Sequence, residues 1–483
     1  MIKVYLDWNV LSQMKNGQHK ELIKILENDD LFLKFFSTSH ITDIFSSFKE
    51  TEEQKELINS DLEFISQITK NWCLYNSTEG KVIAGDYDPK ELFQERVEQK
   101  DLFNDISIDG LSEIFNSNEI GKELGIPIME SLKNLPLEQS FKDSFENPES
   151  EEMMNRLFPG LKDNLTMEGW FNYFNKMLKG LNDGEDYKEL RNIIQESTNL
   201  NRDKLFNNPD PYSFLDNHYK KFGGDRKTPL LDSKHSPEWF NKISNEYVQL
   251  DMHGYQEDKV RIDKGRKETF QNTTEDSFHA AFASTCDFYL VNDKKAFNKT
   301  SKVYDELEIN TWVQKPNEFI EHYNKYLTSR DYQLHLNFFM DLISSNNFIE
   351  QESDRGTFYT IYPPIYLFDF FNKIVRFEGF DGCKYTYLSQ NKPTNYFVTF
   401  IELKKLVQRL EDFFGLDIDN SGELTKDEFY KVEWKKRIWK INENLSLRFQ
   451  ATNYHAQLYF DIEKEPAGTT YNANGGFRRK EVN

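Results

Sequence analysis

The sequence predicts an α/β fold with a mostly parallel sheet, and three observations support this prediction. The chain of 483 residues begins with a short apolar run at residues 2–6. Amphipathic helical segments at 18–26 and 52–72 flank a second apolar run at 31–36. The same alternation returns between about residues 275 and 327. Strands that alternate with helices are typical of a parallel sheet with crossover helices.

Each element has its own local signal. Residues 2–6 lack polar alternation, as expected for a strand covered on both faces. Ser37, Thr38 and Ser39 offer N-cap oxygens to a helix over 40–45. The second half of the domain is predicted as a helix at 275–285, a strand at 288–291, a helix at 294–297, a strand at 307–312 and a helix at 317–327.

The chain divides into a split first domain and a second domain. Between residues 73 and 265, charged helical segments are separated by prolines, which indicates a helical insertion. Residues 167–181 within it carry large apolar side chains at helical spacing, typical of a packed face. Residues 445–449 and 456–462 alternate as a pair of strands. We therefore expect a first domain built from 1–72 and 266–328, an insertion at 73–265, and a C-terminal α+β domain at 329–483.

Composition excludes several classes of protein. Lys and Arg number 60 against 81 Asp and Glu, so the net charge of −21 excludes a protein that coats nucleic acid through its overall field. Three widely spaced cysteines support neither a disulfide framework nor a Cys-based zinc site. No stretch reads as a signal peptide or as a membrane span. We expect a soluble protein in a reducing cytoplasm, with no membrane partner.

Four acidic residues stand at positions where an α/β sheet collects functional groups. Asp7 and Asp293 each follow an apolar strand, so a parallel sheet would bring both to one edge. Asp43 and Asp276 are expected in the first turns of helices, where the helix dipole favours a carboxylate. Carboxylates brought together repel one another unless a cation neutralises them, and oxygen is the ligand that Mg²⁺ prefers.

Four runs of sequence resemble, in order, the motifs of the PIN-like nuclease superfamily. They are Val-Tyr-Leu-Asp-Trp-Asn at 4–9, Thr-Ser-His-Ile-Thr-Asp at 38–43, Asp-Ser-Phe-His-Ala-Ala at 276–281, and Phe-Tyr-Leu-Val-Asn-Asp at 288–293. The resemblance covers about residues 1–70 and 270–328. It implies a three-layer α/β/α fold and a Mg²⁺- or Mn²⁺-dependent nuclease acting on RNA more often than on DNA. By motif, Asp7, Asp43, Asp276 and Asp293 would be the metal-site residues, with Asn9 and Asn292 as supporting polar groups.

The chain departs from the pattern of the superfamily in three ways. Trp8 stands where a small hydroxyl residue is usual, and Asp43 where Glu is usual. The second ligand is therefore one methylene shorter. The interval from Asp43 to Asp276 is 276 − 43 = 233 residues, longer than in a compact member. His279 follows Asp276 by three residues and is expected as a packing group or as support for a ligand.

A second metal signal lies in the C-terminal domain. Residues 417–428 fit the twelve-position EF-hand loop, with glycine at position 6 and an apolar residue at position 8. The pattern predicts Ca²⁺ binding, although no partner loop is evident; the alternative is a polar turn that binds no calcium. The expected ligands are Asp417, Asp419, Ser421, Glu423, Thr425 and Glu428.

Three short basic clusters could contact nucleic acid locally. Lys264, Arg266 and Lys267 lie just before the Asp276 motif and are the predicted substrate-binding residues. A second cluster, 435–437, is interleaved with Trp434 and Trp439, a combination suited to phosphate contacts beside a stacking surface. The third cluster is at 478–480.

The sequence thus predicts a metal-dependent endoribonuclease with a helical insertion and a calcium loop. A regulatory protein partner is expected, and a place in a bacterial toxin or phage-defence system is a hypothesis by family analogy. Two other classes stay open. One is an inactive PIN-like scaffold that binds a partner protein; the other is a calcium-responsive binding protein whose N-terminal acids are structural.

Overall fold

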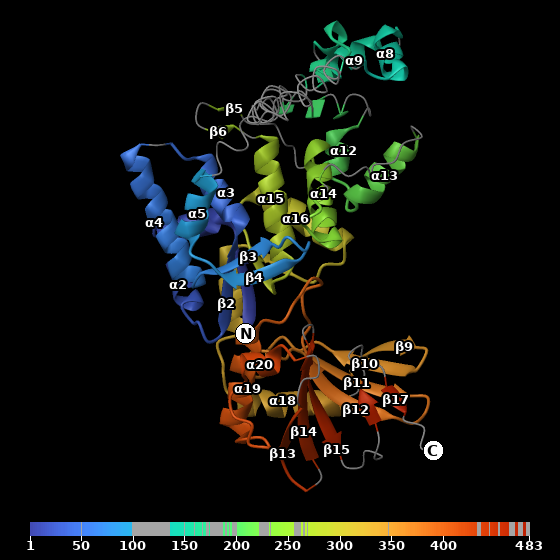
Figure 1. Ribbon diagram of the computed structural model, residues 1–483. Helices are drawn as coiled ribbons and strands as arrows, with labels where there is room; N and C mark the ends of the chain where they lie inside the picture. The colour runs from blue at the N-terminus through green and yellow to red at the C-terminus, as the bar shows by residue number, and fades with distance from the viewer. Residues whose placement is uncertain are drawn as a thin grey trace, which may run out of the picture.

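The computed structural model describes residues 1–98 except 50, 269–452 except 346, 432–435 and 444, and 455–462. It also describes shorter stretches between 136 and 267, and 469–471 and 477–479 in the tail. The described residues are organised around two large sheets, one mostly parallel and one antiparallel (Figure 1).

The first sheet has six strands in the order β4-β3-β2-β1-β7-β8. Every neighbouring pair is parallel except β3 and β4. The predicted mixed α/β architecture with a mostly parallel sheet is therefore confirmed. The strands are β1 (Ile2–Leu6), β2 (Phe32–Ser37), β3 (Trp72–Asn76), β4 (Val82–Asp86), β7 (Phe288–Leu290) and β8 (Trp312–Gln314).

Helices cover both faces of this sheet (Figure 1). Alternate residues of β1 divide between two cores, with Tyr5 in one and Val4 and Leu6 in the other. One core receives α14 (Glu238–Met252), α15 (Phe270–Ala283) and α16 (Lys294–Glu306). The other receives α1 (Trp8–Lys15), α2 (Lys20–Leu26), α3 (Thr38–Ser46), α4 (Glu52–Thr69), α5 (Pro89–Glu98) and α17 (Pro316–Tyr326).

Two boundaries differ from the sequence prediction for local backbone reasons. Helix α4 stops at Thr69 because Lys70 and Asn71 adopt positive φ, and the chain continues into β3 and β4. The sheet therefore extends past residue 72. A strand at 307–312 is wrong, since α16 continues to Glu306 and β8 starts only at Trp312.

The region between β4 and α15 is described only in part. The apolar segment 167–181 lies largely outside the described residues. The described elements are α8 (Gln139–Glu146), α9 (Glu151–Leu157), the 3₁₀ turn η3 (Leu161–Asp163), α12 (Arg202–Phe206), α13 (Pro211–Lys221), β5 (Ile262–Asp263) and β6 (Arg266–Lys267).

The second sheet is antiparallel, in the order β13-β14-β15-β12-β11-β10-β9. The apolar faces of α18 and α19 pack on it with Phe339, Leu406 and Leu388 among the buried residues. The predicted strand pair at 445–449 and 456–462 is confirmed as β14 and β15. The elements are α18 (Tyr332–Ser344), β9 (Ile349–Ser353), β10 (Gly356–Ile361), β11 (Lys373–Gly379), β12 (Lys384–Ser389), α19 (Phe400–Phe414), α20 (Lys426–Phe429), β13 (Arg437–Lys440), β14 (Leu445–Thr452), β15 (His455–Ile462), β16 (Thr469–Tyr471) and β17 (Phe477–Arg479).

The C-terminal unit contacts the first sheet where β1 begins. Lys3 forms a buried ion pair with Glu402 of α19 at 3.0 Å. The backbone N–H of Lys3 donates to Asp287, the residue before β7. Asp7 and Asp293 follow the other ends of β1 and β7, so the candidate site and the C-terminal unit lie at opposite edges of the sheet.

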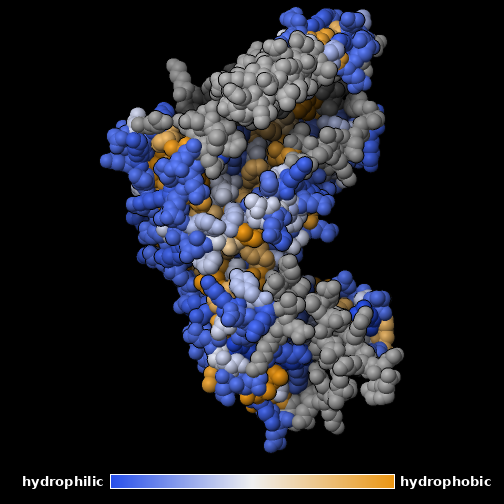
Figure 2. Space-filling model, viewed as in Figure 1, coloured by the Kyte–Doolittle hydropathy of each residue, from blue (hydrophilic) through white to orange (hydrophobic). Residues whose placement is uncertain are grey.

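The surface agrees with the composition. The face seen in Figure 2 is largely hydrophilic over α2 and α4. Among the described residues, no helix has both the length and the apolar character needed to cross a membrane.

Candidate functional site

Asp7 and Asp293 lie at one edge of the sheet because β1 and β7 are parallel neighbours. Each carboxylate also caps the helix that follows its strand. Asp7 accepts the backbone N–H of Asn9 at 3.2 Å. Asp293 accepts the backbone N–H groups of Lys295 and Ala296 at 2.8 and 2.9 Å. Asp7 is 4% exposed, whereas Asp293 is exposed.

Asp43 and Asp276 come from helices, but the predicted position in a first turn is wrong for both. Helix α3 already starts at Thr38, capped by Ser37, and α15 starts at Phe270, capped by Thr269. Both acids therefore lie beyond the first turn, where the helix dipole gives little stabilisation.

We call Asp7, Asp43, Asp276 and Asp293 the four-acid site, because their charges act on one another. Burial raises the pKa of Asp7; His279 opposes the shift, and Asp43 and Asp293 add to it. Loss of solvent also raises the pKa of Asp276 well above its usual range, and Asp7 and Asp43 raise it further. The Asp276 side chain is nevertheless exposed, so the repulsion from Asp7 and Asp43 is the firmer cause.

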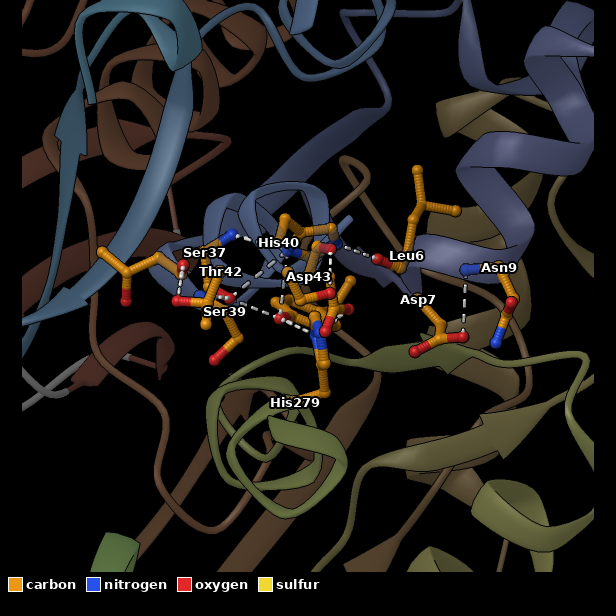
Figure 3. A network of polar contacts seen from close by, with 12 residues as sticks. Leu6, Asp7, Asn9, Ser37, Ser39, His40, Thr42, Asp43 and His279 are labelled. Carbon is orange, nitrogen blue, oxygen red and sulfur yellow. Dashed lines mark hydrogen bonds and ion pairs between the residues drawn. The ribbon is translucent and has the colours of Figure 1, made fainter. Parts of the chain in front are cut away.

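His279 supplies a positive charge inside this group. Its Nε2 lies 3.0 Å from Oδ2 of Asp43, and the two side chains point toward one another in Figure 3. Burial alone would lower the pKa of His279, but the hydrogen bond and charge of Asp43, with the charge of Asp7, raise it to about 9. His279 is therefore an imidazolium at neutral pH, and it neutralises part of the site.

A chain of buried hydrogen bonds fixes the His279 ring. Nδ1 of His279 lies 2.7 Å from the hydroxyl of Tyr5, which lies 2.6 Å from Oγ of Ser37. A protonated Nδ1 donates to the Tyr5 oxygen, and the Tyr5 hydroxyl then donates to Ser37. The ring also meets the edge of His40, with centroids 4.6 Å apart.

His40 is neutral, in contrast to the neighbouring His279. Its Nε2–H donates to the carbonyl oxygen of Leu6 at 2.7 Å, and its Nδ1 accepts the backbone N–H of Ser37 at 3.0 Å. Burial and the adjacent His279 hold the pKa of His40 well below its usual range. One neutral and one charged histidine thus lie side by side.

Glu275 is a fifth acid that the sequence analysis did not assign to the site. Burial raises its pKa to about 7, and the charge of Asp43 adds to the shift. Ser39 donates a hydrogen bond to its side chain. The helical spacing of Glu275 and His279, four residues apart, is the one sequence signal that links Glu275 to the site. Tyr5 and Ser37 carry no such signal.

The two predicted asparagines support the site without entering the charge network. Asn9 contributes its backbone N–H to Asp7. The Asn292 side chain donates to Oε1 of Gln13 on α1 at 2.8 Å, which ties the end of β7 to that helix.

Most of the basic residues predicted to contact nucleic acid have no described side chain. Lys264 lies outside the described residues, and for Arg266 and Lys267 only the backbone of β6 is described. The expectation for the second cluster is wrong in part: Arg437 and Trp439 are buried, at 0% and 2% exposure, so neither offers a phosphate contact or a stacking face. Trp434 and Lys435 lie outside the described part of the chain, as does Lys480; Arg478 and Arg479 are described as backbone of β17.

The site has the oxygen donors that a hard cation requires, in an open arrangement. Within the described residues, no three His, Cys, Asp or Glu side chains are close enough to hold a metal ion as they stand. A cavity of about 840 Å³ lies elsewhere, between α4 and α5.

Comparison of the chain with models of protein families, with curated proteins and with solved structures finds no match.

Proposed function

We propose that the protein is a Mg²⁺- or Mn²⁺-dependent nuclease of PIN-like fold that hydrolyses phosphodiester bonds in RNA. The observation that carries the proposal is electrostatic: Asp43 and Asp293 raise the pKa of Asp7, and Asp7 and Asp43 raise that of Asp276, although the four acids come from separate segments of the chain. Repulsion between carboxylates costs stability, and arrangements that shift pKa values in this way are concentrated at functional sites.

The donor chemistry fits a hard divalent cation. Asp7, Asp43, Asp276 and Asp293 would hold it, all through carboxylate oxygen. Such an ion, when bound, lowers the pKa of a water molecule and neutralises charge on the scissile phosphate. No covalent intermediate with the protein is required.

The protein's own residues prepare the site for that chemistry. The Tyr5–His279 hydrogen bond fixes the imidazolium, and His279 in turn fixes Asp43 at 3.0 Å. The caps on Asp7 and Asp293 orient their carboxylates through backbone N–H groups. Exposed Asp276 and Asp293 leave the site open to a large substrate.

Cleavage of end-labelled single-stranded RNA and DNA in Mn²⁺ tests the proposal. We expect cleavage that EDTA abolishes, with RNA cut faster than DNA. Asp7→Asn and Asp293→Asn should each reduce the rate by at least about a hundredfold, because each removes a metal ligand. Asp305→Asn, a change at an exposed acid on α16, is the matched control and should leave the rate unchanged.

One observation favours a second candidate, a PIN-like scaffold that binds a protein partner without catalysis. Asp43 is already paired with His279, so one proposed metal ligand is engaged inside the protein. If wild-type protein cleaves neither nucleic acid in Mn²⁺ or Mg²⁺, the scaffold is the better account.

A further inference from the structure

Acidic side chains also gather in the loop between α19 and β13. This loop has no part in the proposed nuclease reaction. Asn420 and Gly422 adopt φ of 52° and 67°, the left-handed region that these two residue types tolerate best. Leu424 is 2% exposed and packs in the core of the C-terminal unit. The loop therefore has a defined, anchored shape.

Strand β13 supports this loop where a second EF-hand loop would otherwise do so. The backbone N–H of Ile418 donates to the carbonyl oxygen of Ile438 at 2.9 Å. The indole N–H of Trp439 donates to the carbonyl oxygen of Gly415, also at 2.9 Å. These two hydrogen bonds to β13 hold the loop in place.

Two oxygens in the loop lack hydrogen-bond partners. Oδ1 of Asp417 accepts the backbone N–H of Ser421 at 2.8 Å, which turns the carboxylate across the loop toward that residue. Oδ2 of Asp417 and Oγ of Ser421 are both buried and have no partner among the described residues. Asp417 is 2% exposed. A buried carboxylate oxygen without a donor is costly, so these neighbouring oxygens point to a cation.

Glu428, at position 12 of the loop, has a partner already. Arg437 donates from Nε and Nη2 to the two oxygens of Glu428, at 3.2 and 2.8 Å. The same guanidinium donates to Glu411 at 3.0 Å and to the carbonyl oxygen of Gly422. Arg437 is completely buried, so the charge of Glu428 is balanced before any metal arrives.

We propose that the loop is a calcium site in which Asp417, Asp419, Ser421 and the carbonyl oxygen of Glu423 bind Ca²⁺, while Arg437 keeps Glu428 out of the coordination shell. This site differs from an ordinary EF-hand loop, in which the carboxylate at position 12 binds the ion through both oxygens. Ca²⁺ accepts such an irregular oxygen set, whereas Mg²⁺ demands near-ideal octahedral geometry. With fewer charged ligands, the site binds weakly, with a Kd of about 10⁻⁴ to 10⁻³ M.

Calorimetric titration of CaCl₂ into the full chain separates this site from its alternatives. Every protein in the series carries Asp7→Asn, so that calcium bound at the four-acid site does not contribute. Asp417→Asn and Ser421→Ala should each weaken binding, the first by about tenfold or more. Glu428→Gln should change the affinity less than about threefold, because Glu428 is not a ligand. Asp412→Asn, at an exposed acid of α19 outside the loop, is the control and should change nothing.

Three results would overturn the proposal. They are no calcium binding at millimolar concentrations, a loss in Glu428→Gln as large as in Asp417→Asn, or an equal loss in Asp412→Asn. Magnesium chloride in place of CaCl₂ should give no measurable binding, and equal affinities for the two ions would contradict the choice of calcium.

Thermal unfolding gives a second readout that does not depend on calorimetric heat. In EDTA, Asp417→Asn should be at least as stable as its parent, since it removes a buried unpaired charge while keeping the acceptor for Ser421. CaCl₂ should raise the unfolding temperature of the parent and not that of the variant. A variant that is less stable than its parent in EDTA would show that Asp417 only holds the turn.

Discussion

The four-acid site and the proposed calcium loop, residues 417–428, each contain acidic side chains that pair with a cationic side chain of the protein, but the cation differs. In the first, His279 contacts one acid, Asp43, and its charge depends on pH. In the second, the guanidinium of Arg437 pairs with both Glu428 and Glu411. The charge balance of the first site therefore varies with pH through His279, whereas two acids of the second share one buried guanidinium.

The largest effect is expected when the arginine is removed. Arg437→Met leaves Glu428 and Glu411 without their shared partner, and breaking a buried pair from one side typically costs about 3–5 kcal/mol. Because both glutamates keep some solvent contact, the lower end applies. The free energy of unfolding of the C-terminal unit, measured by urea titration, should fall accordingly.

A surface pair in the same unit provides the control for that comparison. Lys404 and Glu423 lie 2.9 Å apart, and their side chains are 42% and 72% exposed. Lys404→Met should therefore change the free energy of unfolding by less than about 1 kcal/mol. Equal losses of unfolding free energy in the two variants would show that the buried ion pairs of Arg437 contribute no more than a surface pair.

The histidine variant should show a pH effect that the arginine variant lacks. The pKa of His279 is raised from 6.5 to about 9 in the folded protein, so the stabilisation it gives is complete below 6.5 and is lost as the pH rises through 9. In EDTA, the unfolding temperature of the wild type should fall across that window, and His279→Gln should flatten the fall.

Two features keep this measurement specific. The pKa of Glu275 is raised from 4.5 to about 7, so its destabilising effect develops in a lower window, as pH rises from 4.5 to 7. His235→Gln, at an exposed histidine, should leave the profile unchanged. A His279→Gln profile identical to that of the wild type would mean that His279 is not charged in the folded protein.

The smallest effect is expected at the hydroxyl that connects His279 to Ser37. Tyr5→Phe keeps the buried ring but leaves Nδ1 of His279 and Oγ of Ser37 without that partner. The free energy of unfolding should fall by about 1–3 kcal/mol, the cost of a buried unsatisfied group. Tyr87→Phe removes an exposed hydroxyl that is hydrogen-bonded to Tyr75, and it should lower the free energy of unfolding by less. Equal losses in the two variants would show that the hydrogen bonds of Tyr5 to His279 and Ser37 do not stabilise the protein.

Elements with a strong local signal could be predicted from the sequence. The mainly apolar segment at 2–6, the Ser37 cap of α3 and the alternation at 456–462 each predict their element from local sequence, and all three elements are confirmed. Boundaries set by backbone conformation were less accessible. The residue type gives no sign of positive φ at Lys70, so the sequence predicts an end of α4 at residue 72 instead of at Thr69.

The two sites also differ in how many of their residues can be predicted from local sequence. The proposed calcium loop lies in twelve consecutive residues, so its pattern is visible in the sequence, whereas Arg437, nine residues beyond Glu428, is predicted there only as part of a basic cluster that could contact nucleic acid. In the four-acid site, the acids follow strands or stand in motifs, whereas Tyr5 and Glu275 acquire their roles only when α15 packs against β1 and α3. Roles that depend on packing between distant segments leave no local pattern.

We propose that Asp7, Asp43, Asp276 and Asp293 share one divalent cation. Anomalous diffraction from crystals soaked in MnCl₂ tests it most directly. The account predicts a manganese peak among the four carboxylates, lost in crystals of Asp7→Asn. A saturating soak that gives no peak there, or a peak that persists in Asp7→Asn, would contradict it.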